Sequence, residues 1–391
     1  MMTLKYPLIV TVVALIVVGM LFFSFAPMLV EQRQNTVRPG IPTPISQRTA
    51  SLHETLFVAD LHADPLLWAR DLLDRNQYGH VDVPRLIEAN VALQAFTVAT
   101  QVPLERNLTS TPSRHFDLIT PLAVAQRWPL SSWWSVKERA LFQAEKLRQA
   151  ARQSNGKFVL IRTRGELMTY LNSRGNDREM VAGFLGLEGA HALEGELNNI
   201  DELYGAGFRM LGLAHHFDNK VGGSSTGEAK GGLTEFGREV IRRIEELGMI
   251  IDLAHASPAL IEDVTGIARH PVVASHTGVR GTCDNPRNLS DENVRDIAQT
   301  GGVIGIGFWP TAVCGVNVQA IVRAIRYTSD LAGVEHVALG SDFDGAVQTP
   351  FDVTGIARVT EALIVSRFSE KEIRKIMGEN VLRVLKEVFG T

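Results

Sequence analysis

The chain has 391 residues, of which 45% are hydrophobic, so it is long enough to bury the core of one large domain or of two modest ones. Its formal net charge is −4, so it has no basic surplus with which to neutralise phosphate groups. This charge argues against nucleic acid as a partner.

The N-terminal segment differs from the rest of the chain. Residues 6–30 contain no charged side chain, and about 20 helical residues cross a hydrocarbon core roughly 30 Å thick. We therefore predict a transmembrane anchor over residues 1–30. A cleaved signal peptide is the alternative, but its apolar part is normally only about 7–15 residues long, and here the possible cleavage site "SFA" is followed by Pro27. Lys5 precedes the segment and Arg33 follows it, so the positive-inside rule does not decide its orientation.

Residues 31–50 are polar, contain three prolines and are predicted to be a linker. In residues 51–391, short apolar runs alternate with amphipathic helix patterns, which predicts one α/β domain. The eight runs expected to be strands are 57–62, 91–98, 182–188, 209–215, 249–255, 271–276, 302–308 and 336–342.

Near-continuous apolar strands of this kind are typical of a parallel sheet that is buried on both faces. Eight strands alternating with helices are the number that closes a (β/α)8 TIM-like barrel, and the length of the domain fits such a barrel with insertions. A ninth apolar run at 158–162 is expected to be an extra strand within an insertion at about 99–181. An open doubly wound sheet is the alternative, but no glycine-rich nucleotide loop follows an early strand.

Six of the eight predicted strands end on, or just before, a residue type that binds metals or transfers protons. In a (β/α)8 barrel the C-terminal ends of the strands form one rim, so residues that are distant in sequence converge there. A single histidine after a strand is more often structural, but six strands with the same feature favour a site. The residues are His62, Asp64, Glu188, His215, His255, His276 and Asp342.

Imidazole and carboxylate groups without a thiolate suit zinc or a similar divalent ion. The number of such groups exceeds what one tetrahedral ion with an open position requires, whereas a two-metal site bridged by a carboxylate and a hydroxide accommodates them. The domain at 51–391 is therefore predicted to be a metal-dependent hydrolase. His191 and His216 are further histidines that could touch the site, and Asp344 is expected to support the turn that carries Asp342.

The sequence resembles a known family, the membrane dipeptidases or renal-type dipeptidases, which are binuclear zinc peptidases with an amidohydrolase-like barrel. The resemblance runs in family order from about residue 55 to residue 388. The stretches that carry it are "DLHADPL", "GHVDVPRLIEANVALQAFTV", "GFLGLEGAHAL", "LGLAHHFDN", "IIDLAHAS", "VVASHTG", "DNPRNLSDENV" and "LGSDFDG".

This resemblance implies two zinc ions in the site. It implies that His62 and Asp64 bind one ion, that His255 and His276 bind the other, and that Glu188 bridges both. A hydroxide shared by the ions would then be the nucleophile near neutral pH.

The resemblance also implies roles for three residues around the metals. His215 corresponds to the histidine that contacts the substrate and steadies the tetrahedral intermediate. Arg287 corresponds to the arginine that binds the terminal carboxylate of the substrate, for which a guanidinium group is well shaped. Asp342 corresponds to the acid/base carboxylate, which takes the proton of the attacking water and delivers it to the departing amine.

The implied substrates are dipeptides, with N-acyl amino acids, lactones or β-lactams as the alternative for a related metal hydrolase. A membrane-tethered binding module without catalysis is a further alternative, which the complete set of ligand types disfavours. The resemblance also implies a disulfide between Cys283 and Cys314 and a possible homodimer. A disulfide would place the barrel outside the cytoplasm, on the periplasmic side of a bacterial inner membrane. Ala190, where the family usually has glycine, and the unusual segment 99–155 depart from the family pattern.

Overall fold

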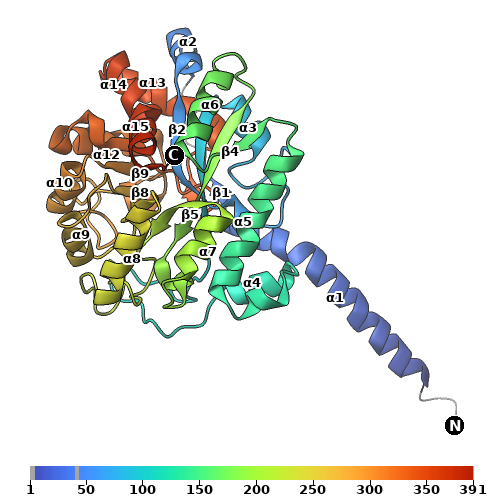
Figure 1. The fold of residues 1–391 in the computed structure, drawn as a ribbon. Helices are drawn as coiled ribbons and strands as arrows, with labels where there is room; N and C mark the ends of the chain where they lie inside the picture. Colours follow the sequence, from blue (N-terminus) through green and yellow to red (C-terminus); the bar gives the residue numbers. More distant parts are fainter. Residues whose placement is uncertain (1–4, 40–43, 391) are drawn as a thin grey trace.

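The computed structural model describes residues 5–39 and 44–390, and its first element is the long helix α1 (Lys5–Gln34), which extends away from the rest of the molecule (Figure 1). Residues Ile9–Gln34 have a hydropathy of 2.8 and are long and apolar enough to cross a membrane, by length and composition. The predicted span at 1–30 lies on this helix, apart from residues 1–4, which are outside the described part of the chain.

Eight parallel strands form a closed barrel at the centre of the molecule (Figure 1). Their order around the ring is β3-β2-β10-β9-β8-β7-β6-β5, and the ring closes because β3 also pairs with β5. The predicted (β/α)8 fold is confirmed. The strands are β2 (Val58–Ala63), β3 (Val91–Ala99), β5 (Val181–Glu188), β6 (Phe208–Gly212), β7 (Ile250–Asp252), β8 (Val273–Thr277), β9 (Val303–Ile306) and β10 (Val337–Leu339).

Each residue of these eight strands is buried, which explains why the strands read as near-continuous apolar runs. Close packing on the outer face of the barrel leaves no room for a side chain at Gly183, where a Cβ would lie 2.5 Å from the ring of Phe96. The ninth strand β4 (Phe158–Leu160) pairs with the first residues of β5, which β6 reaches only from Leu185 onward. It is therefore an extra strand beside the ring, as the run at 158–162 predicts.

Helices surround the barrel and shield its outer face (Figure 1). Several begin at side-chain caps: Thr234 accepts a hydrogen bond from the amide of Gly237, and Ser369 and Glu372 form a capping box. The helices after α1 are α2 (Gln47–Thr55), α3 (Val83–Glu88), α4 (Ile119–Ala125), α5 (Val136–Gln153), α6 (Arg164–Arg174), α7 (Asn199–Ala206), α8 (Glu235–Glu246), α9 (Pro258–Thr265), α10 (Asp291–Gln299), α11 (Pro310–Val313), α12 (Val318–Ala332), α13 (Ala357–Val365), α14 (Glu370–Arg374) and α15 (Asn380–Val388).

The predicted linker at 31–50 is folded against the barrel over much of its length. Its first residues complete α1, and the next form strand β1 (Thr36–Val37), which pairs with β11 (Gln348–Thr349). Residues 40–43 lie outside the described part, and α2 follows from Gln47. The reason for this difference is that Glu31 and Asn35 are buried and find polar partners on the barrel, at Arg70 and Ala346.

The two cysteines, Cys283 and Cys314, form a disulfide with a Cα–Cα distance of 5.3 Å. Cys283 lies in the loop after β8, and Cys314 ends α11, which follows β9. The bond therefore joins two neighbouring loops on the C-terminal side of the barrel strands.

Candidate metal centre

The acidic and histidine residues that follow the predicted strands converge at one end of the barrel. His62 and His276 lie on β2 and β8, and Glu188 is the last residue of β5. His215, His255 and Asp342 each follow the end of their strand by three residues. All of these side chains are buried, because the C-terminal strand ends of a barrel form one rim beneath the loops.

Two compact groups of ligand-type atoms lie in this cluster, and Glu188 belongs to both. The first group is His62, Asp64 and Glu188, and the second is Glu188, His255 and His276. Within each group the ligand atoms lie within 4.8 Å of one another. This arrangement offers two neighbouring positions for cations that share one carboxylate.

The carboxylate of Glu188 is the centre of the cluster. Its Oε1 lies 3.1 Å from the Nε2 of His255, 3.4 Å from that of His276 and 3.7 Å from that of His62. Its Oε2 lies 3.3 Å from the Nε2 of His215. A carboxylate with imidazole nitrogens around both oxygens is well placed to bridge two ions.

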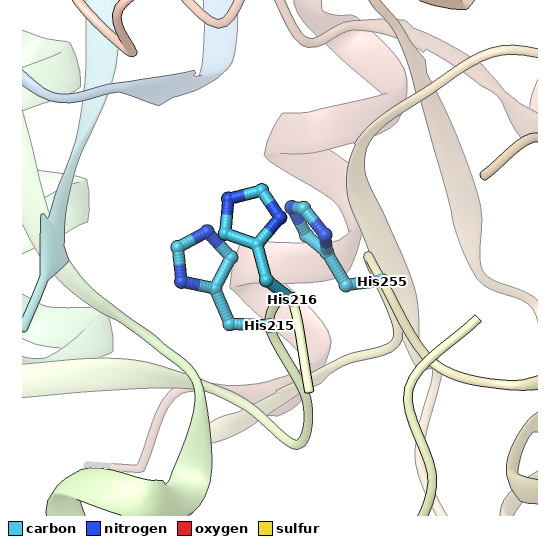
Figure 2. A group of neighbouring side chains, drawn as sticks. All are labelled: His215, His216 and His255. Atoms are coloured by element: carbon cyan, nitrogen blue, oxygen red, sulfur yellow. The ribbon is translucent and has the colours of Figure 1, made fainter. Parts of the chain in front are cut away.

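A further group of ligand-type atoms consists of three histidines, His215, His216 and His255 (Figure 2). His215 and His216 are adjacent in the loop after β6, and His255 approaches them from the loop after β7. The rings of His215 and His216 have centroids 4.0 Å apart. The structure thus brings His216 to the edge of the site, whereas His191 stacks beyond His215 at 6.3 Å and bonds to Thr100.

Several buried polar atoms of the cluster have no hydrogen-bond partner within the described part of the chain. They are the Nε2 of His62, Oδ1 of Asp64, Nδ1 of His215 and Nδ1 of His255. Buried polar atoms are almost always satisfied, so unpaired ones on ligand-type groups indicate a missing partner. The donor set, made of imidazole and carboxylate groups, fits zinc or a similar divalent cation.

The electrostatics of the cluster also fit a cation. Burial raises the pKa of Glu188 well above its usual value and lowers the pKa values of His255 and His276 well below theirs. For His62 burial also acts to lower the pKa, but Asp64, Glu188 and Asp342 outweigh it and raise the pKa to about 10. These three carboxylates concentrate negative charge around His62, and bound metal ions would supply the positive charge that balances it.

A second layer of polar groups orients the ligands from below. Ser275 contacts the Nδ1 of His62 at 3.0 Å and that of His276 at 3.1 Å, and its hydroxyl donates to Asp252 at 2.6 Å. Hydrogen bonds to the outer ring nitrogens of metal-binding histidines fix the ring orientation.

The turn that follows β10 has an unusual backbone. Asp342, Asp344 and Ala346 adopt φ angles of 61°, 64° and 58°, which are rare for residues other than glycine. A backbone conformation of this kind costs of the order of 1–3 kcal/mol for each residue. Here the conformation aims Asp342 into the metal-ligand cluster, where one of its oxygens lies within 4.8 Å of ligand nitrogens of His62 and His276. Burial raises the pKa of Asp342 to about 8.

Arg287 lies in the same cavity and is also buried. Its Nη2 donates to the backbone carbonyl of His276 at 2.9 Å, and its guanidinium carbon lies 5.8 Å from the ring centre of Trp309. Burial lowers the pKa of Arg287 to about 10, against the opposing effect of Asp342 and Glu188. The group remains a cation at neutral pH that faces the cavity, and none of the ion pairs among residues 5–39 and 44–390 includes it.

The cavity has a volume of about 710 Å³ and includes residues that the sequence did not identify. Arg106 and Trp309 line it, as do several residues of α1. Arg106 comes from the loop between β3 and α4, which has no periodicity from which its position could be inferred. The α1 residues read as part of a membrane span, and their composition gives no sign of a second role.

Comparison with known proteins agrees with this geometry. The family model described as membrane dipeptidase, peptidase family M19, matches residues 46–390. The chain belongs to this family. The resemblance noted in the sequence is confirmed, and the chain is a metallopeptidase of the dipeptidase type.

Individual M19 dipeptidases and related proteins are similar to the chain at moderate identity. An uncharacterized dipeptidase of Schizosaccharomyces pombe is 29% identical over 224 residues, which cover 54% of each chain. The solved structure of dipeptidase AC, a metallopeptidase of family M19, is 25% identical with a TM-score of 0.69 and covers 86% of this chain and 100% of its own. A Rhodobacter sphaeroides metallopeptidase, solved with a phosphinate mimic of L-Ala-D-Ala, has the same fold at 24% identity, with a TM-score of 0.70 and coverage of 86% and 100%.

Members of the M19 family depend on metals, and this chain has the histidine and carboxylate cluster for them. The seven residues predicted to follow the strand ends lie together in that cluster. Arg287 lies in the same cavity. The roles of the individual residues remain predictions.

Proposed function

We propose that the protein is a zinc dipeptidase with two metal positions at the barrel mouth. His62 and Asp64 would hold one zinc ion, His255 and His276 the other, and Glu188 both. The observation that carries this proposal is the pair of buried ligand groups that share Glu188, with unpaired ligand atoms in them. When bound, the ions would lower the pKa of a water molecule toward neutrality and so supply the attacking hydroxide.

The substrate would be held by its terminal carboxylate at Arg287. The guanidinium group presents a fork of N–H donors, and burial beside Trp309 strengthens its interaction with an anion. This contact would align the neighbouring peptide bond with Glu188 and Asp342, which line the same cavity.

Two residues would then assist the bond cleavage. Asp342 would take the proton that the attacking water loses and pass it to the amide nitrogen as the C–N bond breaks. His215 would donate a hydrogen bond to the carbonyl oxygen as that oxygen gains negative charge. Its Nδ1 has no partner within the described residues, so a ring nitrogen is free for such a contact.

The test is hydrolysis of plain dipeptides, with L-Ala-D-Ala among them, by the zinc-loaded full-length protein. Asp342→Asn should lower kcat by roughly 10²–10⁴-fold, because the amide cannot accept and return a proton. Zinc content, measured on the same samples, should remain near two ions per chain, because Asp342 is not one of the five assigned ligands.

Asp330→Asn is the matched control, because Asp330 is an exposed aspartate on α12. It should leave turnover at the native level. If the native protein with a full complement of zinc cleaves no dipeptide, the proposed function is wrong. If Asp342→Asn cleaves dipeptides at the native rate, the proposed role of Asp342 is wrong.

We further infer that α1 is a retained anchor that crosses a membrane, with the barrel on the side outside the cytoplasm. Phe22 and Ala26 line the cavity, and cleavage after "SFA" would remove both of them. Their place at the cavity therefore supports retention of the helix. A location outside the cytoplasm is supported by the Cys283–Cys314 disulfide, because such bonds persist mainly in oxidising compartments. The domain would then start near residue 51, with the inner end of α1 from Phe22 onward and strand β1 docked on it.

A further inference from the structure

The inner end of α1 forms one wall of the catalytic cavity. Side chains of α1 line the same cavity as Glu188 and Asp342, and side chains of α4 line it as well. The exposed apolar part of α1 continues from this wall outward along the segment that could cross a membrane (Figure 1). We call this surface the α1–α4 wall and define it by Phe22, Ala26 and Val30 of α1 and Ile119, Leu122 and Ala125 of α4.

This part of α1 is fixed to the barrel. Glu31 forms an ion pair of 2.5 Å with Arg70, and both side chains are only 1% exposed. The side chain of Asn35 accepts a hydrogen bond of 2.9 Å from the amide of Ala346, and β1 pairs with β11 directly afterwards. The wall is therefore part of the folded active-site domain and not a loose tether.

The α1–α4 wall lies across the barrel mouth from Arg287. Around the ring, β3 and β8 are four positions apart among eight strands, so the loops that follow them lie on opposite sides. α4 follows β3, whereas Arg287 follows β8. A substrate with its carboxylate on Arg287 would therefore direct its other end toward the wall.

The apolar side chains of the wall suit a substrate whose end opposite the carboxylate is uncharged. Among the described residues that line the cavity, the acidic ones are Asp64, Glu188 and Asp342, all within the metal-ligand cluster. A free ammonium group at the wall would lose part of its hydration to apolar side chains without gaining a carboxylate, which is unfavourable. An alkyl chain in the same place would gain free energy by leaving water.

We propose that the α1–α4 wall binds an apolar chain on the amino side of the scissile amide, so that N-acylated dipeptides are preferred substrates. This inference rests on the proposed function, because it uses the same peptide-bond cleavage and the same carboxylate contact at Arg287. Hydrolysis breaks the peptide C–N bond and adds a hydroxyl group to the carbonyl carbon and a hydrogen to the nitrogen. The products are an N-acyl amino acid and a free amino acid. A substrate with a long acyl chain could enter from the bilayer along α1.

The experiment compares three substrates on the zinc-loaded full-length protein in lipid nanodiscs: L-Ala-D-Ala, its N-acetyl derivative and its N-decanoyl derivative. The kcat/KM for the decanoyl substrate should exceed that for the acetyl substrate by roughly tenfold or more, because eight additional carbons are buried. Ala26→Trp, which fills the wall, should reduce this ratio about tenfold, mainly by raising KM for the decanoyl substrate.

Leu29→Trp is the matched control, because Leu29 is an exposed residue of the same helix that does not line the cavity. It should keep the native ratio. If Ala26→Trp binds no zinc and so has not folded, Leu122→Trp on α4 provides the same test from the other side of the wall.

Three results would decide against the inference or its basis. A native ratio of one or less would show that the wall does not favour an acyl chain. Equal ratios in the native, Ala26→Trp and Leu29→Trp proteins would show that any preference comes from partition into the bilayer. In both cases cleavage of L-Ala-D-Ala would leave the proposed function standing, whereas failure to cleave any of the three substrates would overturn the proposed function itself.

Discussion

Asp342 and Asp344 are two residues apart in one turn, yet their side chains have opposite surroundings. Asp342 faces the cavity and the metal-ligand histidines. Asp344 accepts hydrogen bonds from the amides of His80 at 2.6 Å and Val81 at 3.1 Å and pairs with Arg70. Its carboxylate is thus fully used in joining the turn to the loop after β2, which leaves Asp342 as the aspartate available for chemistry.

Gly345 allows the turn to hold Asp342 in place. A Cβ at this position would lie 1.9 Å from the Oδ1 of Asp342. Gly345→Ala should therefore move the carboxylate and lower kcat by roughly 10²-fold, the cost of a misplacement of about 1 Å. The change is measured by dipeptide turnover, with zinc content as the check that the metal ligands are intact.

Gly205→Ala on α7 is the control for this substitution, because a Cβ there meets no atom within 4 Å. It should keep native turnover. Native turnover in Gly345→Ala as well would mean that the position of Asp342 does not matter for the reaction.

The helix α1 and the catalytic turn are connected through one arginine. Arg70 lies on the loop after β2 and pairs with Glu31 of α1 on one side and with Asp344 of the turn on the other. Loss of Glu31 would leave the buried Nε of Arg70 without its acceptor, while Asp344 would still pair with the guanidinium group. Helix α1 and the turn that carries Asp342 are therefore joined through Arg70.

Glu31→Gln should lower the free energy of unfolding by roughly 1–3 kcal/mol, the usual cost of weakening the hydrogen bond of a buried donor. Thermal unfolding of the full-length protein in detergent measures the loss. Glu88→Gln, which breaks the exposed pair of Glu88 with Arg75, is the control and should have little effect. Equal melting temperatures for the two variants would mean that α1 is not coupled to the barrel.

The sequence predicts elements whose signal is local and repeated. Barrel strands are buried on both faces, so each appears as an apolar run, and the metal-ligand types recur at the ends of these runs. The docking of α1 could not be predicted in this way. It depends on pairs such as Glu31 with Arg70 and Asn35 with Ala346, which are distant in sequence and belong to no periodic pattern. A polar segment with three prolines is typical of a linker until such partners are known.

The positions of individual side chains at the site also could not be predicted from the sequence. His215 and His216 are adjacent, and residue type alone does not distinguish which ring faces Glu188; the 3.3 Å contact of His215 does. Arg106 comes from a long irregular loop, and no sequence pattern there indicates that its side chain lies at the cavity.

The disulfide links the fold of the whole molecule to its compartment. Cys283 lies in the loop that carries Arg287, and Cys314 ends the helix that follows Trp309. The bond therefore ties together the two loops beside Arg287, the arginine proposed to bind the substrate carboxylate. A barrel in the cytoplasm would lack this connection, because thiols are kept reduced there.

The double variant Cys283→Ser/Cys314→Ser should unfold at a lower temperature and bind dipeptides more weakly. The bond closes a loop of 31 residues in the unfolded chain, which corresponds to roughly 3–4 kcal/mol of stability. Greater freedom of the Arg287 loop should raise KM more than it lowers kcat, because the role proposed for Arg287 is to bind the substrate and not to transfer protons. Thermal unfolding and steady-state kinetics measure the two effects, and a reducing agent added to the native protein should reproduce both. Alkylation of intact cells checks the location, since cysteines that react without prior reduction would place the barrel in the cytoplasm.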